Sequence, residues 1–279
     1  MAGPEAKAGI ENEDYIVNTL NQFRSNEEAR KWLEVLGYDI SKIKKLEAKR
    51  SLKMGLGNIK SDVILFVNQN AHGIQIKKSR KGVNFNHIQR GWTNKFCKEL
   101  NAPSFISDAL KKFVGEDGFQ PTDYMSEKEL EELQSKRKKK GFSEKKIRRL
   151  SSYYKRILLS ELEEKERKEV FAWFEKNKEK IVTSVLRGND KNHQPRHLLV
   201  VEHAKGKITR IGIITMPKAI QYFTTGDVVE TTGGTVLWIG KIKMQRHGAE
   251  KSEGKNAQHL QFKINPLGVF DTPNCKIIS

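Results

Sequence analysis

Two short apolar segments separated by a polar turn constrain this chain more than any other feature. Residues 63–67 are Val-Ile-Leu-Phe-Val, the composition of a strand buried on both faces. A turn rich in Asn and Gln follows, and a second strand begins over residues 72–77. The pattern predicts a β-hairpin with Asp62 before its first strand and Gln75 and Lys77 in its second.

The spacing also predicts which side chains of the hairpin lie together. Pairing Val67 with His72 would place Asp62 opposite Lys77, with Gln75 two residues earlier on the same strand. Because side chains alternate between the faces of a strand, the three polar side chains would share one face. Directly paired Cβ atoms lie about 5 Å apart, and a shift of one residue would separate Asp62 from Gln75 and Lys77.

A carboxylate, an amide oxygen and an ammonium group on one face can hold a divalent metal ion against a phosphodiester. The pattern Asp-x(12)-Gln-x-Lys therefore favours a nuclease. The alternative is an ordinary hairpin with polar residues at its ends. The motif is short, so spacing alone leaves both interpretations open.

The charge of the chain indicates its partner. Its 279 residues, enough for one large or two modest domains, include 52 Lys and Arg but 34 Asp and Glu, a formal charge of +18 and a pI near 9.7. Such an excess favours a polyanion, although ribosomal, RNA-binding and membrane-surface proteins share it. Cys97 and Cys275 match no zinc spacing. With no signal peptide or membrane-spanning segment expected, the chain is predicted to be cytoplasmic.

The N-terminal region is predicted to contain two helices. Residues 12–24 have an apolar stripe of Ile16, Leu20 and Phe23, and Glu13 lies at the head of that stripe. A carboxylate there would point toward the strand ends; the alternative is a solvated residue favoured by the helix dipole. Residues 25–28 form a capping box that opens the second helix.

The rest of the chain changes from helical to strand-like. Residues 127–180 are charged and mostly helical, and nine of the fourteen residues 136–149 are Lys or Arg. That run is expected to be a solvated face or a contact to phosphates. Strands are predicted at 197–201, 208–215, 235–244 and 260–264, with a short helix at 217–223. The predicted class is α/β or α+β.

Four blocks of sequence carry a resemblance to a known family. The chain resembles the small monomeric type II restriction endonucleases of the MspI kind, and is most similar to the HinP-type enzyme that cuts GCGC. The charged residues 136–149 resemble an insertion relative to that enzyme. The blocks lie at residues 26–37; at 60–62 with 74–77, 84–88 and Trp92; at 110–116 with 173–177 and 186–188; and at 245–248 with 260–264.

The resemblance implies the PD-(D/E)xK fold, a mixed central sheet flanked by helices, with Mg²⁺ as cofactor. Asp62 would be the central metal ligand, and Gln75 replaces the acidic residue of the superfamily pattern. An amide oxygen binds Mg²⁺ more weakly than a carboxylate does. The carbonyl of Ile76 would be a further ligand, and Glu13 would act through water. Lys77 would orient the attacking water and stabilise charge on the phosphate.

The resemblance also places sequence recognition in a C-terminal sheet. Arg246 and Lys263 can donate to guanine in the major groove, and Gln261 offers a donor and an acceptor to a base edge. For each of these the alternative is a phosphate contact. The full set of residues assigned to DNA binding is His87, Arg187, Gln245, Arg246, Gln261 and Lys263.

The implied organisation is a catalytic region over 1–118, a basic helical region over 119–188 and a DNA-recognition region over 189–279. The implied protein is a bacterial restriction enzyme that acts on double-stranded DNA as a monomer, alongside a cognate DNA methyltransferase. GCGC is the best candidate for its site. A structure-specific repair nuclease and a non-catalytic DNA-binding protein are the alternatives, and cleavage of plasmid DNA with Mg²⁺ separates the three.

Overall fold

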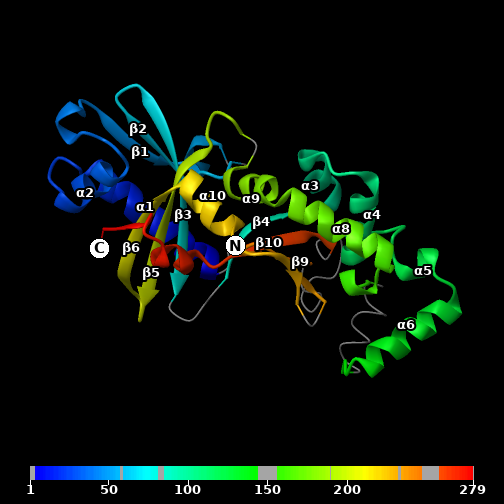
Figure 1. Ribbon diagram of the computed structural model, residues 1–279. Helices are drawn as coiled ribbons and strands as arrows, with labels where there is room; N and C mark the ends of the chain where they lie inside the picture. Colours follow the sequence, from blue (N-terminus) through cyan, green and yellow to red (C-terminus); the bar gives the residue numbers. More distant parts are fainter. Residues whose placement is uncertain are drawn as a thin grey trace. The chain divides into compact units, whose positions relative to one another are not determined.

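The computed structural model describes residues 4–56, 59–80, 85–143, 156–188, 190–231, 234–246 and 258–278. Its contacts divide the chain into two compact units (Figure 1). Unit 1 contains residues 1–86, 182–225 and 264–279, and unit 2 contains 87–181 and 226–263. Each unit is therefore built from separate stretches of sequence. The expected segments 1–118, 119–188 and 189–279 do not coincide with these units.

A mixed sheet forms the centre of unit 1. Among the described residues, six strands pair in the order β1-β2-β3-β5-β6-β11. The pair β3–β5 is parallel and the other neighbours are antiparallel. The strands are β1 (Leu46–Arg50), β2 (Val63–Val67), β3 (Asn70–Arg80), β5 (Pro195–Ala204), β6 (Lys207–Thr215) and β11 (Lys276–Ile277).

Helices cover this sheet. The first face packs on α1 (Pro4–Asn21) and α2 (Glu27–Val35), with Ile16, Leu20 and Trp32 fully buried against strand residues. Both helices were predicted, but α1 begins earlier than residue 12, and the cap of α2 is Asn26, whose side chain accepts from the amide of Ala29. The helix α10 (Met216–Thr224) contacts β5 and β6, and the short helix η6 (Pro266–Asp271) contacts β3 and β5.

The hairpin of β2 and β3 has a different register from the predicted one. Val67 pairs with Asn70 and not with His72, so every partner is displaced by two residues. The turn is tighter because Asn68 adopts the left-handed conformation, with φ of 55°. Its side chain accepts from the amides of Lys44 and Lys45, which fixes the turn against the preceding loop. A displacement by an even number keeps every side chain on its predicted face.

Unit 2 contains a second sheet. Its strands, among the described residues, pair in the order β4-β10-β9-β8-β7. The segment 235–244, predicted as one strand, forms two antiparallel strands instead, because the chain reverses at Gly240 and Lys241. The strands are β4 (Asn86–Gly91), β7 (Val228–Glu230), β8 (Val236–Ile239), β9 (Ile242–Arg246) and β10 (Leu260–Ile264).

The helices of unit 2 include the charged region predicted to be helical. They are α3 (Thr93–Leu100), α4 (Ser104–Val114), α5 (Pro121–Tyr124), α6 (Glu127–Lys139), α8 (Glu164–Lys176) and the start of α9 (Lys178–Arg187). Short helical turns lie at η1 (Ile40–Lys42) and η2 (Leu52–Met54) in unit 1 and at η4 (Leu159–Glu161) in unit 2. The predicted class, a mixed sheet flanked by helices, is confirmed. No helix of the described residues is long and apolar enough to cross a bilayer.

A buried pair of histidines links two strands of unit 1. His72 Nε2 lies 2.7 Å from His197 Nδ1, the rings stack 4.8 Å apart, and the hydroxyl of Tyr38 lies 3.0 Å from His72 Nδ1. His72, at the start of the predicted second strand, lies within β3 with 4% of its surface exposed. Burial, the other histidine and Arg196 lower the pKa of His72 to about 3. Burial and Arg196 lower the pKa of His197 to about 4.

This pair should make the folded state sensitive to acid. Below about pH 6.5 the unfolded chain protonates both histidines while the folded chain keeps them neutral, so stability is lost as the pH falls toward 4. Each histidine can contribute about 1.4 kcal/mol per pH unit. We expect His72→Gln to reduce the slope of unfolding free energy against pH by about one proton over this range.

Urea unfolding at a series of pH values measures that slope. His193→Gln is the control, since this histidine lies outside the buried pair. Equal slopes for the wild type and His72→Gln would contradict the assignment.

Candidate active site

The β2–β3 hairpin brings the three predicted polar residues together in unit 1. The amide of Asp62 donates to the carbonyl of Ile74 at 2.9 Å, and Asp62 Oδ2 accepts from the amide of Ile76 at 2.6 Å. The ammonium nitrogen of Lys77 lies 3.7 Å from the same carboxylate oxygen. The carboxylate is therefore fixed beside the strand that carries Gln75 and Lys77.

The end of β1 holds Asp62 from the other side. The amide of Ser51 donates to the Asp62 carbonyl at 3.0 Å, and its hydroxyl donates to that oxygen at 3.2 Å. Close approach of the chain is also required at Gly73, where a Cβ would lie 2.2 Å from the hydroxyl oxygen of Ser61. A side chain at this position would displace the residue that precedes Asp62.

Gln75 presents a buried amide oxygen with no partner. Its side chain is 1% exposed, and Gln75 Oε1 forms no hydrogen bond within the described part of the chain. A buried acceptor without a hydrogen bond lowers the stability of the folded state by about 1–3 kcal/mol. A ligand that binds to this oxygen removes that cost. A bound cation would supply that interaction.

Glu13 reaches the same site from α1, as the helical stripe predicted. Glu13 Oε2 lies 3.3 Å from Arg50 Nε, and Arg50 also donates to both carboxylate oxygens of Asp14 at 3.0 and 3.1 Å. Arg50 and Asp14 were not identified from the sequence. The buried guanidinium of Arg50, at the end of β1, thus forms ion pairs with two carboxylates of α1.

The pKa of Glu13 depends on its burial and on the charges around it. Burial raises the pKa of Glu13 to about 7, and the negative charge of Asp62 adds to this effect. Arg50 and Lys77 oppose it. Two carboxylates close enough to interact in a partly buried site are the arrangement that a bound divalent cation would stabilise.

The donor set fits Mg²⁺. It combines carboxylate and amide oxygens, which hard cations prefer, and one of those oxygens is the unpartnered Gln75 Oε1. No cluster of three or more His, Cys, Asp or Glu suitable for a metal occurs in the described ranges. A metal centre at this site therefore depends on the side-chain amide of Gln75. The backbone amide of Ile76 donates to Asp62 Oδ2, so the backbone of Ile76 lies beside the Asp62 carboxylate.

A polar face of the unit 2 sheet carries three of the predicted DNA-binding residues. Gln245 of β9 pairs directly with Gln261 of β10, and Gln245 Nε2 donates to Gln261 Oε1 at 3.3 Å. Lys263 pairs with Lys243, a residue that was not identified from the sequence. Burial and then the charge of Lys243 lower the pKa of Lys263. Two side-chain amides and two ammonium groups thus lie on one face of the sheet. We call these four residues, Lys243, Gln245, Gln261 and Lys263, the polar array.

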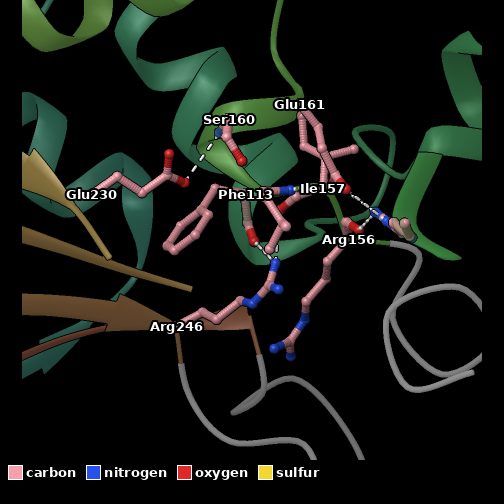
Figure 2. Close-up of polar contacts among 9 residues, drawn as sticks. Phe113, Arg156, Ile157, Ser160, Glu161, Glu230 and Arg246 are labelled. Carbon is pink, nitrogen blue, oxygen red and sulfur yellow. Dashed lines mark hydrogen bonds and ion pairs between the residues drawn. The ribbon is translucent and has the colours of Figure 1, made fainter. Parts of the chain in front are cut away.

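Arg246 lies on the opposite face of the same strand. Its guanidinium donates to the carbonyls of Phe113 and Ile157 at 2.9 and 2.7 Å, and the residue is 7% exposed (Figure 2). Because neighbours on a strand point to opposite faces, Gln245 and Arg246 cannot both join the polar array. In this arrangement Arg246 anchors β9 to α4 and to the segment around Ile157.

His87 and Arg187 are the other two predicted DNA-binding residues. His87 is exposed in β4 of unit 2. Arg187 is half-buried at the end of α9 in unit 1, and its Nε has no hydrogen-bond partner among the described residues.

Two comparisons with known proteins found restriction endonucleases to which the chain is similar. The family model of the R.HinP1I restriction endonuclease matches residues 139–270. Among solved structures, the crystal structure of restriction endonuclease MspI in complex with its cognate DNA is similar, with a TM-score of 0.51 and 13% identity. That similarity covers 90% of this chain and 87% of the MspI chain. No curated protein sequence matches the chain.

The fold is thus the fold of a restriction endonuclease. Together with the family match, it supports a type II restriction endonuclease of the MspI and HinP1I type, as the resemblance in the sequence implied. The matched range contains the polar array of unit 2 but not the β2–β3 hairpin.

The anchoring position of Arg246 can be tested through stability. Arg246→Met should lower the free energy of unfolding by about 2–4 kcal/mol, because two carbonyls at this buried contact lose their donor. Lys243→Met, on the other face of β9, is the matched control and should change it by less than about 1 kcal/mol. Urea unfolding measures both. Equal small changes would show that the two carbonyls do not depend on Arg246.

Proposed function

We propose that this chain is an Mg²⁺-dependent type II restriction endonuclease. It hydrolyses phosphodiester bonds of double-stranded DNA at a short palindromic site, for which GCGC is the best candidate. The approach of the Lys77 ammonium to within 3.7 Å of Asp62 supports the catalytic part of this proposal, with Gln75 on the same face of β3 as Lys77 and Glu13 influenced by the charge of Asp62.

Each residue of the site has a separate role in this mechanism. Asp62, Gln75 and the Ile76 carbonyl would hold the metal ion, and Glu13 would act on it through water. Bound Mg²⁺ supplies positive charge to the scissile phosphate and lowers the pKa of water. The ammonium group of Lys77, 3.7 Å from Asp62, donates to the attacking water and to the phosphate as negative charge develops.

Recognition of the site belongs to the polar array of unit 2. Lys263 donates to guanine O6 and N7, and Gln245 and Gln261 offer donors and acceptors to neighbouring base edges. Lys243 joins them because it pairs directly with Lys263. Arg246 supports β9 and does not read a base, while His87 and Arg187 contact the duplex elsewhere.

The remaining features follow from this role. The enzyme works as a monomer in the bacterial cytoplasm, beside a DNA methyltransferase that protects the same site. One catalytic hairpin per molecule then cuts the two strands in successive events.

Cleavage of plasmid DNA tests the catalytic assignment. With Mg²⁺ we expect discrete fragments whose ends map to one palindrome, and chelation should abolish cutting. Lys77→Ala should lower the rate at least about 10²-fold, because a donor to developing charge is lost, while DNA binding in chelator stays within a few-fold of wild type.

Lys78→Ala is the matched control, since that side chain lies on the other face of β3 and should leave the rate unchanged. Random degradation would contradict a site-specific enzyme. Unchanged cutting by Lys77→Ala would remove Lys77 from the mechanism.

The amide ligand gives a second test. Gln75→Glu supplies an anionic oxygen, so the Mg²⁺ concentration for half-maximal cleavage should fall by roughly tenfold. Gln75→Leu should instead raise it or abolish cleavage. Gln69→Glu adds the same charge at the exposed hairpin turn and serves as control. A Gln75→Leu enzyme with the metal dependence of wild type would exclude this ligand.

A further inference from the structure

The C-terminal end of α6 carries a dense group of exposed charges in unit 2. Lys136, Lys138 and Lys139 lie in its last turn, and Lys140 is its C-cap. All four side chains are exposed, and none forms an ion pair with another described residue. We call these four residues the lysine cluster. The family resemblance assigned no role to this part of the chain.

A buried arginine, Arg137, fixes the part of α6 that carries the lysine cluster. Arg137, in the middle of the cluster, has only 2% of its side chain exposed and forms a two-pronged ion pair with Glu161 at 2.7 and 2.8 Å. It also donates to the carbonyl of Arg156 at 2.8 Å. A buried guanidinium with this geometry fixes the orientation of the helix around it. The lysines are therefore presented outward from a fixed position.

The same anchor connects α6 to the sheet that carries the polar array. Next to Arg156, the Ile157 carbonyl accepts from Arg246 of β9, and the amide of Ser160 donates to Glu230 of β7 at 3.0 Å (Figure 2). Residues 156–161 thus bind α6 on one side and two strands of the sheet on the other. The lysine cluster and the polar array belong to one connected framework within unit 2.

The charge along α6 is strongly asymmetric. Its first half contains Glu127, Glu129, Glu131 and Glu132, whereas the lysine cluster holds four positive charges within five residues. Basic residues near a helix C-terminus are favoured by the dipole, but neighbouring like charges repel one another. A polyanion at this end relieves that repulsion, and the acidic half disfavours contact along the rest of the helix.

We infer that the lysine cluster binds phosphates of duplex DNA outside the recognition site and reads no bases. This inference rests on the proposed function for the identity of the polyanion. Contacts of this kind position a protein on the duplex and raise its affinity for any sequence. Each phosphate contact adds about 0.9 to the dependence of log affinity on log salt concentration.

The test is the salt dependence of DNA binding by the full chain. Binding is measured in chelator by fluorescence anisotropy, on a labelled duplex of several helical turns with one GCGC site and on a duplex with that site scrambled. The test variant replaces Lys136, Lys138, Lys139 and Lys140 with Ala. The control variant replaces Lys31, Lys42, Lys49 and Lys168 with Ala, which are also exposed but ion-paired. Both variants lose the same total charge.

Between about 50 and 200 mM salt, the test variant should show a slope shallower by about 0.9 for each lost contact, up to about 3.6 for all four. It should bind both duplexes more weakly by the same factor. A slope equal to that of the control variant would overturn the inference. A change in the preference for GCGC would also overturn it, because it would indicate base contacts.

Failure of the proposed function would look different. Wild-type protein that neither cuts DNA nor prefers any sequence would remove the restriction assignment. The difference in salt slope between the test and control variants would still decide whether the lysine cluster binds phosphates.

Discussion

The hydrogen bond from the Ile76 amide to Asp62 Oδ2, 2.6 Å long, is the contact on which the catalytic site depends. It joins the residue before β2 to the strand that carries Gln75 and Lys77, and it fixes one carboxylate oxygen beside the Lys77 ammonium. Ser51, which follows β1, donates to the backbone carbonyl of Asp62, and Arg50, one residue earlier, forms an ion pair with Glu13. The end of β1 thus positions both carboxylates of the site.

Polar groups serve the two units in different ways. In unit 1, Gln75 Oε1 is buried without a hydrogen-bond partner among the described residues, which suits a site completed by a cation. In unit 2, the buried guanidiniums of Arg137 and Arg246 are satisfied by neighbouring carbonyls and a carboxylate, which suits a rigid support. Unit 2 thus carries both the polar array, which is suited to contacts with bases, and the lysine cluster, which is suited to contacts with phosphates.

The sequence allowed the face of the catalytic residues to be predicted but not their register. Alternation along β3 determines that Gln75 and Lys77 share a face, and a turn tightened by two residues at Asn68 preserves it. Arg50 could not be found, because β1 has no apolar alternation of its own and its partners come from α1. The anchoring of Arg246 could not be predicted, because the segment that forms β8 and β9 was interpreted as one strand over residues 235–244.

Anomalous diffraction from crystals grown with Mn²⁺ and a duplex containing the site would locate the metal ion in the β2–β3 region. We expect a peak within about 2.0–2.4 Å of a carboxylate oxygen of Asp62 and of Gln75 Oε1. A peak at another position on the protein, with the duplex bound and these two side chains unliganded, would contradict it.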